Sequence, residues 1–363
     1  MHICFSCVEF FGAGIQGGFG RATRFLGREL ARRGVRVSVI VPRRGELQEG
    51  FVDGMQVIGF DPSRPWTAVA AYRETKADIF HSQDTSMGTA YARMAGGFSR
   101  HVVTFRDPMD TRDWKVETSL SGKSAIGYRT YQWFIDNPLV DWAVRRADAR
   151  YCAAKFLIPK VTQKYSLSEP PRFLATPVDI PEHVEKSERP TVVFVGRWDP
   201  RKRPEEFFEL AARFPEVDFV AVGGSSDAAR DAHLRAIGHA LPNMQMPGII
   251  DQFSSNSLTR ILSSAWILAN TSAREGLPTA FVEAAAHRCA ILSRHDPDEF
   301  ASQFGRVADD GDMSAALRWL LEGDRWRAQG ERGYAYVRDT FSTERAVDAH
   351  LVEYQTLLAG RAP

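Results

Sequence analysis

Cysteine is scarce in this chain of 363 residues, which contains only Cys4, Cys7, Cys152 and Cys289. Four scattered cysteines exclude a disulfide framework and are typical of a reducing compartment, so we expect a cytoplasmic protein. Cys4 and Cys7 have CxxC spacing, but they lie in an apolar run that predicts a β-strand. Residues three apart on a strand face opposite sides of a sheet, which disfavours a shared metal or redox role.

The sequence also lacks long apolar runs and an excess of either charge. No stretch of 18 apolar residues occurs, and no basic segment precedes the apolar N-terminus, so we expect neither a membrane-spanning helix nor a signal peptide. The 46 basic residues nearly balance the 45 acidic ones, which gives no reason to expect a nucleic-acid partner. We therefore expect a soluble protein that is at most peripheral to a membrane.

Short β-rich runs alternate with helical patterns along the chain, and its length predicts about two domains. In the first part we expect a helix over residues 20–33 and parallel strands at 3–8, 35–41, 78–81, 101–104 and 149–153. The alternation lapses over residues 166–189, which contain several prolines. It then resumes with strands at 191–195, 218–222, 266–269 and 290–293.

This pattern predicts an α/β protein with two Rossmann-like domains whose parallel sheets face a central cleft. The expected domains are residues 1–173 and 174–342, and residues 343–363 form a C-terminal helix that can pack back on the first domain. Open α/β sheets bind ligands at the carboxyl ends of their strands, so the functional residues are expected in the loops that follow strands.

A glycine-rich loop, GAGIQGGFG over residues 12–20, follows the first expected strand. Glycines let backbone N–H groups approach an anion, and the next helix offers its positive end, so the loop predicts phosphate binding. It contains the dinucleotide pattern GxGxxG, but the second strand ends in VPRR without an acid for a ribose. An NADP-dependent oxidoreductase that uses Arg43 and Arg44 remains an alternative, as does a turn without a ligand.

A second loop, GRWDPRK over residues 196–202, follows a strand in the second half. Arg197 and Lys202 lie five residues apart there, and such a pair can clamp a diphosphate, the arginine in bidentate fashion and the lysine as a point charge. The alternative is that both are solvated surface residues.

A third segment, REGLPTAFVE over residues 274–283, combines two carboxylates with a helix start. A carboxylate accepts hydrogen bonds from vicinal hydroxyls, so Glu283 suits a ribose and Glu275 a hexose. Backbone N–H groups at the helix start can meet a phosphate between them. A purely structural role of Glu283, as an acid near a helix N-terminus, is the alternative.

Taken in order along the chain, these features resemble glycosyltransferase family 4, whose members are retaining enzymes of the GT-B fold. The similarity extends over roughly residues 1–345 and is strongest over 190–310. The matching features are Gly17-Gly18, Gly196-Arg197 with Lys202, Gly248-Ile249-Ile250, and Glu275 with Glu283 as the E-x7-E motif.

The resemblance implies a glycosyltransferase that moves a sugar from a nucleoside diphosphate sugar to a hydroxyl of a glycan, a lipid-linked molecule or a small molecule. By resemblance, the leaving phosphate helps to deprotonate the acceptor, and the protein stabilises the developing charges. The roles implied are the diphosphate for Arg197 and Lys202, the transferred sugar for Glu275, the ribose for Glu283, the nucleobase for Gly248, Ile249 and Ile250, and the phosphate for Gly17 and Gly18. The start of the helix in the third segment adds further donor-binding candidates, Gly276, Leu277, Pro278 and Thr279.

One departure from the family pattern lies after the strand at 101–104. The family usually carries a histidine there, whereas this chain has Arg106 and Asp107. The segment His81-Ser82-Gln83-Asp84 resembles the family's HxH(D) segment, with Gln83 in place of the second histidine. We expect Asp84, Arg106 and Asp107 on the acceptor side, with Asp107 a candidate catalytic group. A donor other than the usual one, a non-catalytic GT-B protein that binds nucleotide sugar or glycan, and simple helix capping by both acids remain alternatives.

Two short strings, Asp296-Pro297-Asp298 and Asp310-Gly311-Asp312, match the DxD pattern of metal-dependent transferases. Such short matches arise by chance, and the GT-B resemblance implies that side-chain cations replace a metal. We therefore expect no metal and no other cofactor.

An arginine-rich face is predicted on the first helix. Arg21, Arg24, Arg28 and Arg32 recur at helical spacing, opposite Leu26 and Leu30. A solvated helix face is the ordinary interpretation. The functional alternative is contact with an anionic membrane surface or a polyanionic glycan.

Overall fold

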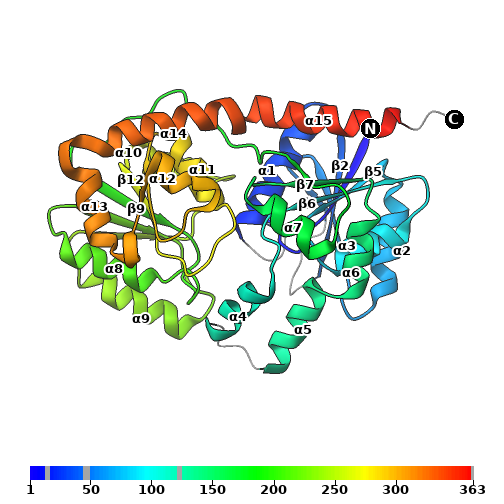
Figure 1. Ribbon diagram of the computed structural model, residues 1–363, viewed down its shortest axis with the longest axis horizontal. Helices are drawn as coiled ribbons and strands as arrows, with labels where there is room; N and C mark the ends of the chain where they lie inside the picture. Colours follow the sequence, from blue (N-terminus) through cyan, green and yellow to red (C-terminus); the bar gives the residue numbers. More distant parts are fainter. Residues whose placement is uncertain (13–16, 44–49, 121–124, 361–363) are drawn as a thin grey trace. The chain divides into compact units, whose positions relative to one another are not determined.

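The structure, a computed structural model, describes residues 1–12, 17–43, 50–120 and 125–360. It divides into two compact units (Figure 1). Unit 1 comprises Met1–Asp110, Gly122–Pro177 and Thr343–Pro363, and unit 2 comprises Thr111–Ser121 and Val178–Ser342. Each unit has a sheet flanked by helices, which confirms the prediction of two Rossmann-like domains. The segment 111–121 groups with unit 2, although it lies inside the first domain as expected from the sequence.

The sheet of unit 1 has the strand order β3-β4-β2-β1-β5-β6-β7-β8, and all neighbours are parallel except β3 and β4. The strands are β1 (His2–Ser6), β2 (Arg36–Pro42), β3 (Gly50–Val52), β4 (Met55–Phe60), β5 (Ile79–Gln83), β6 (Arg100–Phe105), β7 (Ala149–Cys152) and β8 (Arg172–Phe173). The helices are α1 (Gly18–Arg32), α2 (Pro65–Thr75), α3 (Met87–Ala95), α5 (Ala125–Ile135), α6 (Pro138–Arg145), α7 (Leu157–Tyr165) and α15 (Thr343–Ala359).

The last helix, α15, is built into the core of unit 1. Val347 and Tyr354 are fully buried in the same hydrophobic cluster as Phe5 and Leu26. The Tyr354 hydroxyl also lies 2.6 Å from Nδ1 of His81, whose other ring nitrogen lies 2.7 Å from the Thr104 hydroxyl. A strand of the sheet and the end of the chain are therefore joined by a buried polar contact.

The sheet of unit 2 has the order β11-β10-β9-β12-β13-β14, with parallel neighbours. Its strands are β9 (Thr191–Val195), β10 (Asp218–Val222), β11 (Met244–Gly248), β12 (Ile267–Asn270), β13 (Ala290–Ser293) and β14 (Gly305–Val307). Its helices are α4 (Thr111–Leu120), α8 (Pro204–Arg213), α9 (Ala228–His239), α10 (Ser257–Ser264), α11 (Thr279–Ala286), α12 (Phe300–Phe304), α13 (Met313–Leu321) and α14 (Arg325–Phe341), with short 3-10 turns η1 (Pro297–Glu299), η2 (Asp309–Gly311) and η3 (Glu322–Asp324).

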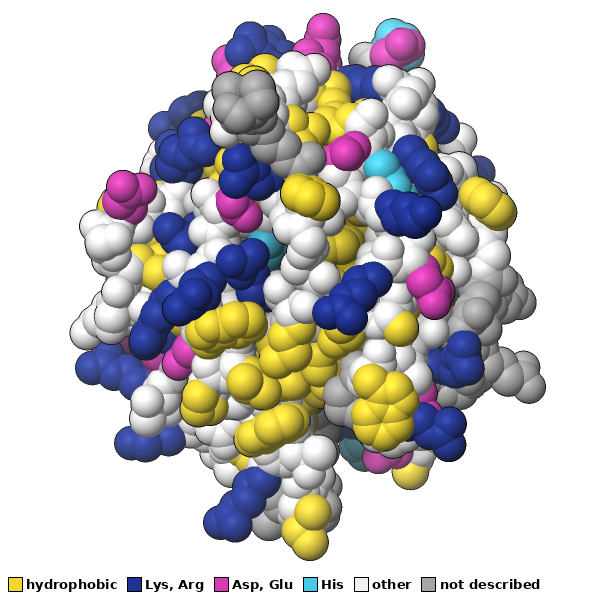
Figure 2. Space-filling view, turned by 90° about the vertical axis from the view of Figure 1, so that its right-hand side faces the viewer, with side chains coloured by type: hydrophobic (Ala, Val, Ile, Leu, Met, Phe, Trp, Pro, Cys, Tyr) yellow, Lys and Arg dark blue, Asp and Glu magenta, His cyan; other side chains and the backbone are white. Residues whose placement is uncertain are grey.

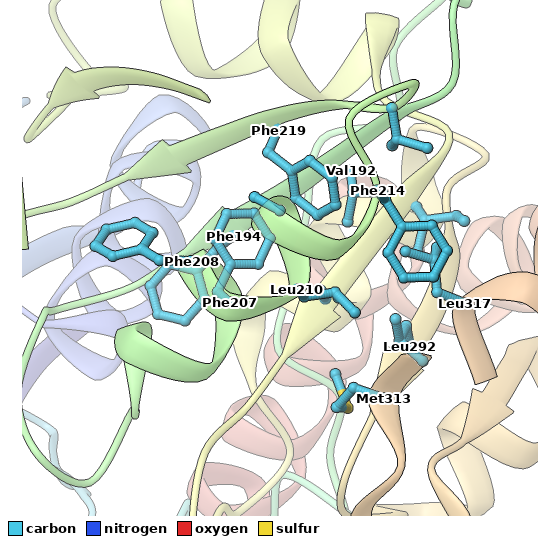
Figure 3. Close-up of a cluster of buried hydrophobic side chains, with 14 of the residues drawn as sticks. Val192, Phe194, Phe207, Phe208, Leu210, Phe214, Phe219, Leu292, Met313 and Leu317 are labelled. Carbon is cyan, nitrogen blue, oxygen red and sulfur yellow. The ribbon is translucent and has the colours of Figure 1, made fainter. Parts of the chain in front are cut away.

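Aromatic side chains fill the core of unit 2 between the sheet and α8. Phe194 and Phe219 of neighbouring strands face Phe207 of α8, Phe208 lies beside Phe207 (Figure 3), and all four are buried. The rings of Phe207 and Phe219 meet edge to face with centroids 5.3 Å apart. This packing fixes β9 and α8, and hence the loop between them.

No helix in the described part of the chain is long and apolar enough to cross a bilayer.

We predict that Tyr354→Phe lowers the free energy of unfolding by about 1–3 kcal/mol, because it leaves a ring nitrogen of buried His81 without its hydroxyl partner. Urea unfolding followed by circular dichroism measures the change. Gln355→Ala, on the exposed side of the same helix, is the matched control and should change the value by less than about 0.5 kcal/mol. Equal destabilisation by both variants would contradict the role of this contact.

Candidate functional site

The carboxyl ends of β9 and β12 form the switch point of the unit 2 sheet. From β9 the strand order runs to β10 and β11 on one side, and from β12 it runs to β13 and β14 on the other. Open α/β sheets bind ligands at such a point. The loops after these two strands carry the cations and the first carboxylate that the sequence indicates.

The loop after β9 is fixed by its backbone and by one aromatic side chain. Trp198 is fully buried, packs edge-on against Phe208, and donates its backbone N–H to the Gly224 carbonyl at 2.8 Å. Gly223 has φ +140°, and any side chain there would collide with the Gly196 carbonyl. This close approach requires glycine and holds the loop, while the side chain of Arg197 stays 45% exposed and lies 3.3 Å from Asp199.

Lys202 and Glu275 form an ion pair across the two loops. The Lys202 ammonium contacts Oε1 of Glu275, and the same oxygen accepts hydrogen bonds from Asn270 at 3.2 Å and from Ser272 at 2.5 Å. Burial would raise the pKa of Glu275, but the charges of Lys202 and Arg201 and the hydrogen bonds from Lys202 and Ser272 lower that pKa to about 2. Glu275 is thus a fixed carboxylate that can orient a hydroxyl group.

Asn270 and Ser272 were missed by the sequence analysis. They lie in ILANTS at the end of β12, and the signal that could have found them is the change from apolar to polar residues where the strand ends.

The ends of β10 and β11 continue the same edge of the sheet. Gly248, with φ +83°, accepts a hydrogen bond from the Gly223 N–H at 2.9 Å, and the side chain of Ile249 beside it is exposed. Ile250 is partly buried. An exposed apolar side chain next to bent backbone offers a surface on which a planar base can lie.

Helix α11 follows the Glu275 loop. Pro278 is its N-cap residue and Thr279 its first residue, which places Glu283 in the second turn with a partly buried side chain. Gly276 is buried, and Leu277 is partly buried. The backbone before Thr279 is therefore close to Glu275 along the chain, at the positive end of the helix.

In unit 1, the carboxylate of Glu9 lies next to the glycine loop. Gly17 is the N-cap residue of α1 and Gly18 its first residue. A side chain at Gly17 would collide with the carboxylate of Glu9, so that carboxylate lies at the helix N-terminus, where negative charge is favourable. Residues 13–16 of the GxGxxG pattern, and Arg44 of the NADP alternative, lie outside the described residues.

The two residues that depart from the family pattern, Arg106 and Gln83, are hydrogen-bonded to each other. Arg106 donates to the Gln83 side-chain oxygen at 2.5 Å and to the Thr176 hydroxyl at 2.8 Å. Arg106 is buried, which lowers its pKa to about 10, so the guanidinium stays charged at neutral pH. The end of β6 thus carries a buried cation whose position depends on β5.

Asp84 follows β5 in a left-handed conformation, with φ +84°. Burial and the nearby charge of Asp107 raise the pKa of Asp84 to about 6. The capping alternative for Asp84 is wrong, because Ser86 is the N-cap residue of α3. A strained acid with a raised pKa at the carboxyl edge of a sheet is typical of a functional site.

One aspartate of each DxD string has a local structural role. Asp296 accepts backbone hydrogen bonds from Ala301 at 2.8 Å and from Ser302 at 3.1 Å, and Asp312 caps α13 by accepting from Ala315 at 3.0 Å. Within residues 1–12, 17–43, 50–120 and 125–360, no three His, Cys, Asp or Glu side chains are grouped as metal ligands.

We predict that Asp84→Asn stabilises the protein increasingly as pH rises above about 4, with the full gain reached above about pH 6. The folded-state pKa lies above the ordinary value of 3.8, so Asp84 costs stability once it ionises, and that cost grows as pH rises from about 4 through 6. Urea unfolding should show a gain of roughly 1–3 kcal/mol at pH 8 and almost none at pH 4. Asp348→Asn, at an exposed acid of the same unit, should show no such pH dependence, and an equal gain at both pH values would contradict the assignment.

Both halves of the chain match family models of glycosyltransferases. The model for "Glycosyltransferase Family 4" matches residues 16–182, and the model for "Glycosyl transferases group 1" matches residues 176–320. No curated protein matches the chain significantly.

Three solved structures illustrate the similarity of fold. Sucrose-phosphate synthase from Thermosynechococcus elongatus is 16% identical with a TM-score of 0.76, and the match covers 99% of this chain and 100% of that one. HepE from Anabaena, in complex with UDP and glucose, is 12% identical with a TM-score of 0.71, over 98% and 100%. The catalytic domain of starch synthase IV from Arabidopsis thaliana, bound to ADP and acarbose, is 13% identical with a TM-score of 0.66, over 99% of each chain. These likenesses confirm the predicted GT-B fold.

Proposed function

Since the chain is a family 4-type glycosyltransferase of the GT-B fold, we propose that it transfers a sugar from a nucleoside diphosphate sugar to a hydroxyl acceptor with retention of configuration. The observation that carries the proposal is the Lys202–Glu275 pair at the switch point of unit 2, with the partly exposed Arg197 on the same loop as Lys202. The NADP-dependent alternative loses its basis, because both halves of the chain match glycosyltransferase models.

In this proposal the donor binds to unit 2. Arg197 and Lys202 neutralise the diphosphate, and the fixed carboxylate of Glu275 orients hydroxyls of the transferred sugar. Glu283 accepts from the ribose hydroxyls, and Ile249 lies against the base. Solved structures of this fold were obtained with UDP for HepE and with ADP for starch synthase IV, which supports a nucleoside diphosphate sugar as the donor, and the proposal does not specify its base.

The proposed chemistry uses no metal. Two side-chain cations supply the charge that a divalent ion supplies elsewhere, and a departing diphosphate oxygen takes the proton of the acceptor hydroxyl. Asp84, Arg106 and Asp107 lie at the carboxyl edge of the unit 1 sheet, which supports a role on the acceptor side. The acceptor is a glycan, a lipid-linked molecule or a small molecule.

The test is product formation from a panel of UDP, GDP and ADP sugars, in excess EDTA, with the anomeric configuration of the product read by NMR. Lys202→Ala and Glu275→Ala should each lose about 10²–10³-fold in turnover, because each removes a charge that faces the reacting groups. Arg213→Ala, at an exposed cation on α8, is the matched control and should retain activity. Inverted product, a metal requirement, or full activity of both variants would each contradict a part of the proposal, and binding without turnover would favour the non-catalytic alternative.

We also propose a peripheral contact with a membrane, but the burial and ion pairs of the arginines on α1 do not favour that helix as the contact surface. The side chains of Arg24 and Arg28 are only 11% and 18% exposed and are paired with Asp53 and Glu29, while Arg32 is 63% exposed. Arg21 is partly buried. Half of the arginine face is thus engaged inside unit 1.

Helices α5 and α6 offer a better surface. Figure 2 shows hydrophobic side chains gathered on one face of the molecule, with Lys and Arg side chains around them. The exposed side chains of α5, of α6 and of its C-cap residue Arg146 include two tryptophans, two aliphatic residues and three arginines. These are Ile126, Arg129, Trp133, Leu139, Trp142, Arg145 and Arg146. None of the described residues of these two helices is an exposed acid. Tryptophan and arginine together suit an anionic lipid surface.

We predict that the protein binds vesicles containing anionic phosphatidylglycerol. The double substitution Trp133→Ala with Trp142→Ala should weaken this binding about tenfold or more, because it removes the two indole rings that would be buried in the lipid interface. Co-sedimentation at low and high salt is the measurement, and binding should fall as salt rises. Trp66→Ala, at another exposed tryptophan, serves as control. Unchanged binding by the double variant, or binding only to neutral vesicles, would contradict this surface.

A further inference from the structure

Helix α4 is an unexpected part of unit 2. It lies between β6 and α5 in the sequence, yet it groups with the donor unit. Trp114 is buried and Asp113 and Glu117 are partly buried, whereas Lys115 and Ser119 on the other side are exposed. The helix is therefore amphipathic, and one face packs against unit 2.

Two acids on that face reach two arginines of the loops described above. Oδ1 of Asp113 accepts a hydrogen bond from Nε of Arg274 at 2.8 Å, and these side chains are 17% and 7% exposed. Oε2 of Glu117 lies 3.9 Å from Nη1 of Arg201. Since Asp113 and Glu117 are one helical turn apart, a single face of α4 makes both contacts.

The two arginines are the immediate neighbours of the central ion pair. Arg274 precedes Glu275, and Arg201 precedes Lys202. The backbone N–H of Ala273 also donates to the Arg201 carbonyl at 2.8 Å, which joins the two loops directly. Each acid of α4 thus holds the residue next to one member of the Lys202–Glu275 pair.

We propose that Asp113 and Glu117 are positioning residues of the donor site, which hold the two loops so that Lys202 and Glu275 meet the donor together. This inference rests on the proposed function and adds to it a segment from the first half of the chain. The Asp113–Arg274 contact is short and nearly buried, so it should carry most of the effect, and the longer Glu117–Arg201 contact should carry less.

The experiment is calorimetric titration of UDP, GDP and ADP into the full chain, followed by steady-state kinetics with the matching sugar donor. Asp113→Ala should weaken nucleotide binding and raise the donor KM about tenfold, with kcat changed by less than about threefold, because the loops shift while the reacting groups remain. Glu117→Ala should change the donor KM by about threefold. Asp113→Glu should recover most of the loss, and Lys115→Gln, on the exposed face of α4, is the matched control.

The outcomes separate the two proposals. Wild-type protein that binds none of the three nucleotides contradicts the proposed function, and this inference falls with it. Wild-type binding together with unchanged binding by Asp113→Ala contradicts the positioning role alone. Tighter binding by Asp113→Ala also contradicts it, because the acid would then compete with the diphosphate. If Asp113→Ala fails to fold, Glu117→Ala, at the more exposed contact, decides with its expected threefold change.

Discussion

The proposed donor site of unit 2 depends on one ion pair, Lys202 with Glu275, whose side chains are only 17% and 8% exposed. Burying two charges is costly unless both are close together and hydrogen-bonded, and here Asn270 and Ser272 share the same carboxylate oxygen. The sheet makes this arrangement possible, because β9 and β12 are neighbours and their carboxyl ends bring two distant segments together. The loops stay in place because Trp198 is packed in the core and Gly223 permits the close backbone contact.

The fold could be predicted where strands are buried on both faces. The expected strands at 191–195 and 218–222 coincide with β9 and β10, since continuous apolar runs mark central parallel strands. The edge strand β11 was missed, because MQMPG is partly exposed and contains proline. The β3–β4 hairpin was missed as well, and part of the sequence before it lies outside the described residues.

For the candidate site, the types of residues were predictable but their partners were not. Lys202 and Glu275 were singled out separately, yet their contact spans 73 positions of sequence, and no local pattern encodes it. The same holds for Arg274 with Asp113 of α4, which are 161 positions apart. Arg106 and Gln83 were each noted as departures from a family pattern, and only the structure shows that they bond to each other, so that the two changes act as one unit. Glu9 escaped notice because a single acid after a strand carries no signal.

A crystal structure of the chain with a nucleoside diphosphate bound would test directly whether unit 2 holds the donor. We expect diphosphate oxygens within hydrogen-bonding distance of Lys202 and Arg197, with Glu275 still beside Lys202. A nucleotide bound instead at the glycine loop of unit 1, with the loops after β9 and β12 empty, would contradict this expectation.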